Sequence, residues 1–378
     1  MLVNGLYLTL LIGPAVPIPV PPPVLESLQS VQVNTSGDRS GFQLTFTVGK
    51  TSLIQLALLP AGYFDPMGTR VVIVATLYGI PNVLMDGFVT RQEIQPSNEP
   101  GKSTLTITGE DLTVAMDLLQ ITMMYPAMPD IAQVNLILVK YAFLGMIPVV
   151  VPPFLSTVRT PIDGWITQTD TDLQHIRTIA SQNGYVFYIE PGPLPGQSIA
   201  YFGPDIRVPL PQAALSVNMD AHTNVESLSF SLNGLQKRIE IINVLDPITG
   251  RIPVPVPMPD INIFKPPLGV RPTPPAKIVF DRTSAALPFD EALKQAIGRG
   301  IQSSAAITGN GSLNVLRYGQ ILRARTLVGV RGAGLAYDGF YYVDSVTHNI
   351  KQGEYKQSFT LSRDGLISNT QVVMAGVA

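Results

Sequence analysis

The chain of 378 residues contains no cysteine, which excludes a disulfide framework and any thiolate metal site. Charged residues make up only 14% of it and the formal net charge is −2, which argues against broad electrostatic binding to nucleic acid or anionic membranes. No apolar run approaches the roughly 18 residues that a transmembrane helix needs. We therefore expect no nucleic-acid specificity and no stable membrane insertion.

Residues with catalytic or metal-binding chemistry are also scarce. The chain has three histidines, at positions 175, 222 and 348, and no two of them have the spacing of a metal site. The carboxylate pairs Glu110-Asp111 and Asp290-Glu291 lie where helices are expected to begin, so capping and the helix dipole explain them. The nucleophile-elbow, P-loop and dinucleotide-binding signatures are missing. We predict that the chain is not an enzyme and binds no cofactor or metal.

Glycine is dense at one place, residues 329–334, with the sequence GVRGAG. A phosphate-binding loop would be followed by a helix and by Gly-Lys-Ser/Thr. Neither follows here, and we interpret the segment as a loop between strands.

Apolar residues and proline are abundant. Apolar residues make up 46% of the chain, so we expect neighbouring subunits to cover some of its faces. The 34 prolines are densest at residues 13–25, 147–154 and 247–277. Because proline fixes φ and removes a backbone donor, these stretches predict extended linkers or arms.

Strand patterns dominate both ends of the chain. Phe42, Leu44 and Phe46 alternate with polar residues, the period of a half-buried strand. Similar early patterns, separated by turn residues, occur at 71–79, 82–94 and 103–109. The later strands are expected at 223–234, 305–317, 321–328, 340–350 and 355–363, with an amphipathic helix at 288–301.

The middle of the chain mixes helices and strands. Asp111 is expected to cap a short helix, and a second helical segment covers 131–144. A third helix is capped by Thr169 or Thr171 and ends at Asn183-Gly184, before a hairpin at 185–190 and 198–203. The fold class is therefore α+β and mainly β, with two strand-rich regions flanking an inserted α+β segment.

Two motifs resemble a known family. They are ITQTDTDLQHIRTIASQNGYVFYIE at 166–190 and YDGFYYVDSVTHNIKQGEYKQSFTLSRDGL at 337–366. In this order, they resemble the central baseplate hub protein of contractile phage tails and tail-like contractile injection systems. That family includes the late-control D proteins and the hub part of VgrG-like spikes. The chain departs from the pattern at Leu173, where an aromatic residue is usual, and in its long proline-rich stretches.

The resemblance implies two tail-tube-like antiparallel β-barrel domains flanking the inserted α+β domain. Three subunits would then present six similar barrels and adapt a sixfold tube to a threefold spike. The implied domains are a first barrel at 1–110 completed by 210–245, an insert at 111–209, a proline-rich extended arm at 246–276, and a second barrel with one helix at 277–378.

The C-terminal hairpin is the candidate functional element. In its second strand, Tyr355, Phe359 and Leu361 belong to one face, while polar residues form the other. We expect the apolar face to cover the barrel, the polar face to line a water-filled channel, and the edge to pair with a neighbouring barrel. The alternative is an ordinary barrel strand with a solvated outer face. The candidate subunit or tube interface residues are Tyr341, Tyr342, Tyr355, Lys356, Ser358, Thr360 and Arg363.

The function implied is that of a structural baseplate hub. Its expected partners are two further copies in a homotrimer, the tail tube or a tube-initiator protein, the spike protein, and baseplate wedge components. We expect it to be assembled in the cytoplasm and to become part of a virion or injection particle. Two alternatives are a tube-initiator or distal tail protein and a tail-associated cell-wall hydrolase. The missing catalytic constellation argues against the hydrolase.

Overall fold

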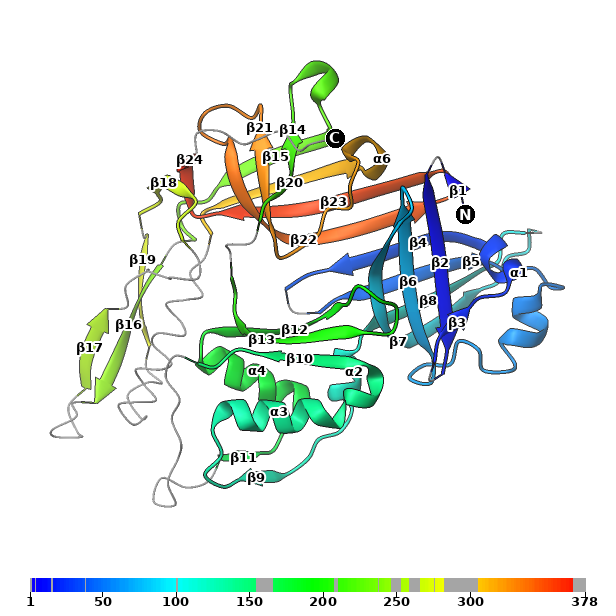
Figure 1. Ribbon diagram of the computed structural model, residues 1–378, viewed down its shortest axis with the longest axis horizontal. Helices are drawn as coiled ribbons and strands as arrows, with labels where there is room; N and C mark the ends of the chain where they lie inside the picture. Colours follow the sequence, from blue (N-terminus) through cyan, green and yellow to red (C-terminus); the bar gives the residue numbers. More distant parts are fainter. Residues whose placement is uncertain are drawn as a thin grey trace.

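A large β-sheet dominates the computed structural model. The structure describes residues 2–369 apart from 4, 15, 38, 100, 154–165, 207–209, 237, 246–252, 258–265, 275 and 282–304. In this part, 14 strands form one continuous sheet, and the helices gather mainly beneath it (Figure 1). The expected mainly β, α+β fold class is confirmed.

The first 111 residues form what we call the N-terminal half of the sheet. Its strand order is β1-β2-β6-β7-β8-β5-β4, and all of these neighbours are antiparallel. A short helix, α1 (Pro22–Glu26), and a π-helical turn, η1 (Ile54–Leu58), lie in its connections. The strands are β1 (Leu2–Val3), β2 (Leu6–Gly13), β3 (Ile18–Pro19, paired with β2), β4 (Leu28–Thr35), β5 (Gly41–Thr47), β6 (Arg70–Leu77), β7 (Ile80–Gln95) and β8 (Thr104–Asp111).

Six later strands form the C-terminal half, in the order β14-β21-β22-β23-β20-β15. They are β14 (Gln212–Ser216), β15 (Val225–Leu232), β20 (Ile307–Asn314), β21 (Leu327–Arg331), β22 (Gly339–Lys351) and β23 (Glu354–Arg363). The Asn224 N–H donates to the Ser216 carbonyl at 3.1 Å, which links the start of β15 to the end of β14. The expectation that residues 210–245 complete the first barrel is wrong, because β14 and β15 pair with β21 and β20.

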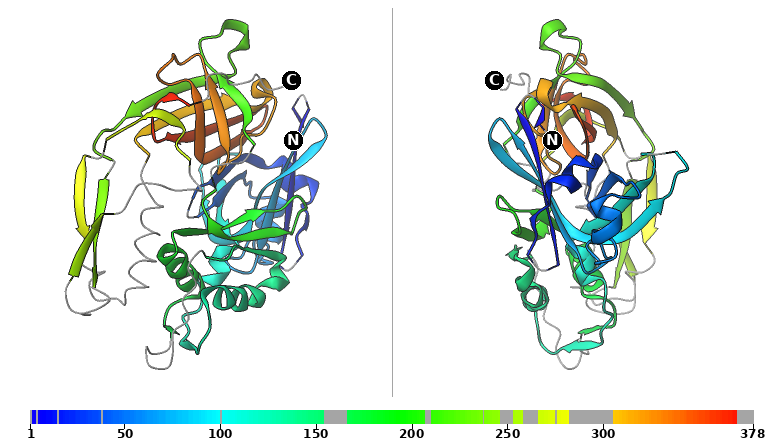
Figure 2. Two further views of the ribbon diagram at one scale, coloured as in Figure 1. Left: turned by 60° about the vertical axis from the view of Figure 1, so that its left-hand side comes forward. Right: turned by 90° about the vertical axis from the view of Figure 1, so that its right-hand side faces the viewer.

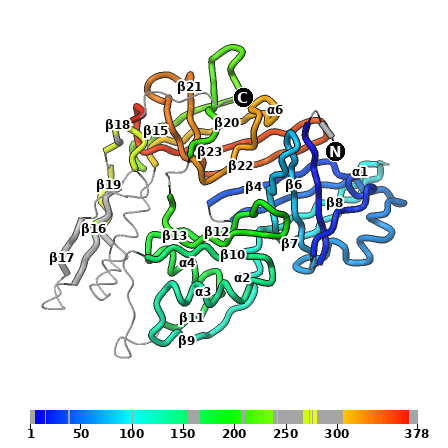
Figure 3. Tube along the Cα trace, viewed as in Figure 1, coloured from blue at the N-terminus to red at the C-terminus, as the bar shows by residue number. Residues whose placement is uncertain are grey.

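The two halves are joined within the chain by β4 and β22. The two strands lie side by side (Figure 3). They are antiparallel, with Val33 opposite His348 and Val31 opposite Ile350. On its other side the hairpin is bounded by β20, which pairs with β23. The hairpin's edge therefore pairs with the N-terminal half of the same chain, and it is not free to pair with a barrel of another subunit. Buried side chains of both halves form one hydrophobic core.

The insert between the halves has its own core. A three-stranded sheet, β10-β13-β12, packs against α3 and α4. Thr171 caps α4 by accepting the Gln174 N–H at 3.3 Å, as expected. The helix after Asp111 is shorter than expected, four residues long. The elements are α2 (Thr113–Met116), β9 (Met123–Tyr125), α3 (Asp130–Lys140), η2 (Ala142–Leu144), β10 (Met146–Val150), β11 (Ile166–Gln168), α4 (Asp172–Gln182), β12 (Tyr185–Pro191) and β13 (Ser198–Pro204).

A buried ion pair attaches the insert to the N-terminal half. The Arg70 guanidinium donates to both carboxylate oxygens of Asp86 at 2.7 Å and to the Leu144 carbonyl at 2.8 Å. Both charged side chains are almost fully buried. Because Arg70 and Asp86 belong to the sheet and Leu144 to the insert, the charges hold the two units together.

Part of the proline-rich region forms a small sheet that projects from the body (Figure 2). In it, β17 (Pro253–Pro257) and β19 (Lys277–Asp281) flank β16 (Arg238–Leu245). A further strand, β18 (Gly269–Pro272), pairs with β24 (Gly365–Ser368) beside the C-terminal half. The expected arm is therefore partly strand, and β19 does not pair with the second half.

The helix expected at 288–301 lies outside the described residues. The strand expected at 321–328 starts later, at Leu327. The Gln357 side chain explains the difference, because it accepts the Leu322 N–H at 2.9 Å and donates to the Leu322 carbonyl at 2.8 Å. A side chain thus replaces the strand partner. Among the described helices, none combines the length and apolar character needed to cross a bilayer.

Candidate functional site

The structure divides the seven candidate interface residues into two groups. Lys356, Ser358 and Thr360 lie on the outer face of β23 and are at least partly exposed. The other four are buried inside the chain, so they present no surface to a subunit or tube, and their assignment to an interface is corrected. They are Tyr341, Tyr342, Tyr355 and Arg363.

Each buried residue has an internal partner. The Arg363 guanidinium lies 4.4 Å from the centre of the Tyr341 ring and donates to three backbone carbonyls, those of residues 336, 338 and 365, at 2.7–2.9 Å. Burial lowers the pKa of Arg363. Tyr342 packs in a small apolar cluster with Leu268 and Leu327. These contacts organise the C-terminal half from within.

His348 and Tyr355 form a buried pair at the junction of the halves. The Tyr355 hydroxyl and His348 Nδ1 are 2.7 Å apart. Burial, with a smaller contribution from Arg323, lowers the pKa of His348 to about 3, and burial raises the pKa of Tyr355. Both groups are therefore neutral near pH 7 and serve the packing of the sheet.

The exposed residues belong to a polar surface that crosses both halves. Residues directly opposite one another on antiparallel strands project from the same face, so the register can be followed from β20 to β7. One row along it is Asn314, Lys356, Asn349, Gln32, Gln43, Thr108 and Arg91. A parallel row is Ser227, Ser312, Ser358, Thr347, Asn34 and Gly41. We call the surface made by these two rows, with Thr360 beside the second row, the polar face.

No residue of the polar face is fully buried, and most are uncharged amides or hydroxyls. Some bond to one another across strands: Thr347 Oγ1 donates to Asn34 Oδ1 at 3.2 Å, and the Ser227 and Ser312 hydroxyls are 2.8 Å apart. Lys356 is neutralised by Glu354 at 2.9 Å and Glu226 at 3.3 Å. Such a surface holds water and gives a passing molecule neither an apolar patch nor a strong field of one sign.

Sequence reasoning found only the hairpin's share of this polar face. The polar positions of β4, β5 and β8, such as Gln32, Gln43 and Thr108, alternate with core residues and were visible as a pattern. Their alignment with the hairpin was not visible, because it depends on the pairing of β4 with β22.

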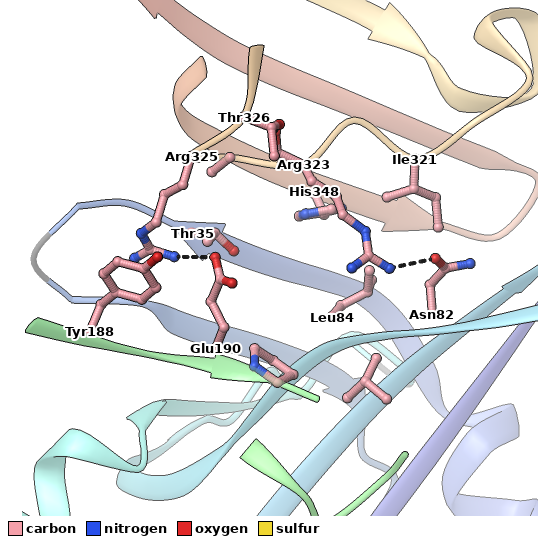
Figure 4. A pocket seen from close by; sticks show the side chains of 13 residues that line it. Thr35, Asn82, Leu84, Tyr188, Glu190, Ile321, Arg323, Arg325, Thr326 and His348 are labelled. Atoms are coloured by element: carbon pink, nitrogen blue, oxygen red, sulfur yellow. Dashed lines mark hydrogen bonds and ion pairs between the residues drawn. The ribbon is translucent and has the colours of Figure 1, made fainter. Parts of the chain in front are cut away.

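A cavity of about 210 Å³ lies where the two halves meet the insert. Arg325, Arg323 and Glu190 project into it (Figure 4). Arg325 Nη1 lies 2.9 Å from Glu190 Oε1, and its guanidinium stacks 4.0 Å above the Tyr188 ring. Arg323 donates to Asn82 Oδ1 at 2.8 Å. Because these contacts cross from the C-terminal half to the insert and the N-terminal half, they fix the relative position of the three units.

Most of the carboxylates and histidines considered for catalysis have structural partners where they are described; the exposed His222 side chain is the exception. Asp111 is buried and accepts the backbone N–H groups of Ser40 and Thr113 at 2.9 Å; its burial raises its pKa. Glu110 pairs with Arg39 at 3.3 Å. His175 stacks on Tyr125, and burial lowers its pKa. The pair Asp290-Glu291 lies outside the described residues. In the part of the chain that the structure covers, no group of three or more His, Cys, Asp or Glu side chains could hold a metal ion.

No family model matches the sequence, and no curated protein is significantly similar to it. Solved structures are similar in fold. A tail protein from Neisseria meningitidis MC58 is 14% identical with a TM-score of 0.60, over 96% of this chain and 98% of that one. The 43 kDa tail protein of prophage MuSo2 from Shewanella oneidensis is 13% identical with a TM-score of 0.61, over 95% and 100%.

A third similar structure is a chain of the Francisella PdpA–VgrG complex, in its half-lidded form. It is 8% identical with a TM-score of 0.58, over 98% of this chain and 60% of that one. At these identities the comparisons establish the fold and no more. This chain therefore has the fold of phage tail proteins and of a chain in a VgrG complex.

Proposed function

We propose that the chain is a structural baseplate hub of a phage tail or a tail-like injection system. It would form a homotrimer that adapts a sixfold tail tube to a threefold spike, and it would act by docking and not by catalysis. Its partners would be further copies of itself, the tube or a tube-initiator protein, the spike, and wedge components. The full-length similarity in fold to two tail proteins supports a place in a tail.

The observation that carries the proposal is the continuity of the polar face across both halves. A hub needs two β modules per subunit, so that three subunits offer six similar units to the tube. Here two strand-rich halves share one sheet, and their common face is polar and mostly uncharged. We propose that this face lines the channel of the assembled ring, with Lys356, Ser358 and Thr360 on its wall.

The oligomeric state is the first test. Light scattering on the purified protein at micromolar concentration should give the mass of three chains. A stable hexamer would favour the tube-initiator alternative, and a persistent monomer would contradict the hub.

Cysteine labelling tests whether the polar face lines the channel. The labelling is specific to introduced cysteines because the chain has none of its own. Single cysteines would replace Gln43 in the N-terminal half and Ser358 in the C-terminal half, with Lys50→Cys as an exposed control away from the polar face. In the trimer, a small maleimide should modify all three positions. A bulky polymer-linked maleimide should modify only the control. Equal modification of all three by the bulky reagent would place the polar face on the outside.

A further inference from the structure

A second, larger cavity of about 710 Å³ lies at one end of the C-terminal half. Its walls come from the β14–β15 connection, the end of β21 and α6 (Val315–Tyr318), with Tyr78 of the N-terminal half on the rim. The β14–β15 connection stands out from the body in both views of Figure 2. The polar face and the junction cavity use none of the basic residues that line this space.

The charge of this cavity has one sign. Arg317, Arg331 and His222 line it, and they come from α6, β21 and the β14–β15 connection. No carboxylate is among the described lining residues. Neither guanidinium forms an ion pair or a side-chain hydrogen bond with any part of the chain that the structure describes. Two unpaired cations that line one space attract an anion.

The wall that carries His222 is held in place by its own contacts. Gly332 has φ +85°, and a Cβ there would lie 1.9 Å from the Val217 carbonyl, so the connection packs directly on the end of β21. The Asn224 side chain accepts the Ser216 N–H at 2.7 Å and donates to the Ala214 carbonyl at 2.9 Å. The glycine-rich stretch at 329–334 is thus a close-packed strand end that positions Arg331.

We infer that this cavity, which we call the basic cleft, binds an acidic segment of a partner protein. Carboxylates complement the three basic side chains, while Ser216, Thr223 and Gln320 on the walls offer polar contacts to a peptide backbone. The space is large for a single inorganic anion and has room for several residues of a peptide. Nucleic acid fits poorly, because its affinity comes from many phosphate contacts along a basic track. The inference does not depend on the trimer or on the channel.

The test measures binding of a fluorescent polyglutamate peptide to the full chain at low ionic strength by anisotropy. Reversal of both charges in Arg317→Glu/Arg331→Glu should weaken binding at least about tenfold. The matched control, Lys50→Glu/Lys102→Glu, changes the net charge equally at exposed sites and should bind like the wild type. Ala221→Trp, at an exposed lining position, should weaken binding several-fold without changing charge.

Three results would overturn the inference. The first is equal loss of binding in the cleft and control variants, which would indicate nonspecific attraction. The second is unchanged binding in both Arg317→Glu/Arg331→Glu and Ala221→Trp. The third is that a short oligothymidine or inorganic phosphate binds more tightly than polyglutamate, and that this binding is lost in the same cleft variants. Thermal unfolding of each variant should match the wild type, because the substituted side chains are not part of the core.

Discussion

The two halves of the sheet are built from the chain in different ways. The strands of the N-terminal half all come from the first 111 residues. Its core is mainly aliphatic and aromatic, and its buried Arg70–Asp86 pair bonds to the insert. The C-terminal half combines strands from residues 212–232 with strands from 307–363. Its interior contains a buried arginine and a His–Tyr–Gln cluster, at Arg363, His348, Tyr355 and Gln357.

This difference shows where specific polar contacts are needed. Strands that are close in sequence find their register through short connections and alternating burial. Strands drawn from distant segments lack that help, and buried polar groups accept only one arrangement of partners. We interpret Arg363 and Gln357 as the groups that fix the register of the C-terminal half. The following predictions test that contrast, from the largest effect to the smallest.

The largest effect is expected from Arg363→Ala. The substitution removes the side-chain donor from three backbone carbonyls, of which that of residue 336 keeps the Ile367 N–H, and it opens a cavity beside Tyr341. Each carbonyl left without a donor costs at least about 1 kcal/mol and the cavity adds to this, so the free energy of unfolding should fall by about 3 kcal/mol. Urea unfolding measures it. Arg317→Ala, at an exposed site of the same half, is the control and should stay close to the wild type; a similar loss in both would refute the special role of Arg363.

In the N-terminal half the largest polar effect should come from Asp86→Ala. The substitution leaves the buried Arg70 charge without its carboxylate, at a cost of about 3 kcal/mol. Because Arg70 also bonds to Leu144, hydrogen exchange should rise first in the insert. Loss of protection confined to the strands of the N-terminal half would instead mean that the ion pair supports the sheet alone.

Lowering the pH should destabilise the C-terminal half before it destabilises the N-terminal half. The pKa of His348 is lowered by burial to about 3, below its unfolded value of about 6.5. Between these values the unfolded chain binds the proton and the folded chain does not, so stability is complete above about pH 6.5 and falls as pH decreases. The loss from pH 6 to 4.5 should be about 2 kcal/mol.

His348→Gln should remove most of this pH dependence, which urea unfolding across the same pH range would measure. Residues 1–111 contain no histidine. As the pH is lowered, hydrogen exchange should therefore increase in β22 and β23 before it increases in β6. The exposed His222→Gln variant serves as the control and should keep the wild-type slope. Part of the remaining pH dependence should come from His175, because burial lowers the pKa of this residue as well. An unchanged slope in His348→Gln would contradict the assignment.

The smallest effect is expected on the polar face, where the two halves should behave alike. Thr108→Val and Thr360→Val replace partly exposed hydroxyls of the polar face, one in each half. Each should change the free energy of unfolding by no more than about 0.5 kcal/mol, as measured by thermal unfolding. A loss above about 1 kcal/mol in either variant would show that the face serves the fold and not only its surroundings.

Local patterns predicted much of the fold. The alternation in residues 42–48 and 355–363 gave the strands and their buried faces, and Thr171 with Asn183 bounded α4 as expected. The same alternation already placed Tyr355 and Arg363 on the inward face of β23. Burial of Tyr342 could not be predicted, because it depends on Leu268, which is far away in the sequence.

Some features were thus determined by the sequence alone. They are the α+β class, the separate insert, the inward and outward faces of most strands, and the lack of cysteine chemistry. Residue periodicity and composition act over a few positions and can be recognised without a structure. Only the tertiary structure decided which strands are neighbours. The pairing of β4 with β22 closed the hairpin's edge and aligned the polar face. The pairings of β14 with β21 and of β15 with β20 brought Arg317, Arg331 and His222 around one cleft. Such contacts join segments far apart in sequence, and their choice depends on how all the hydrophobic faces are buried at once.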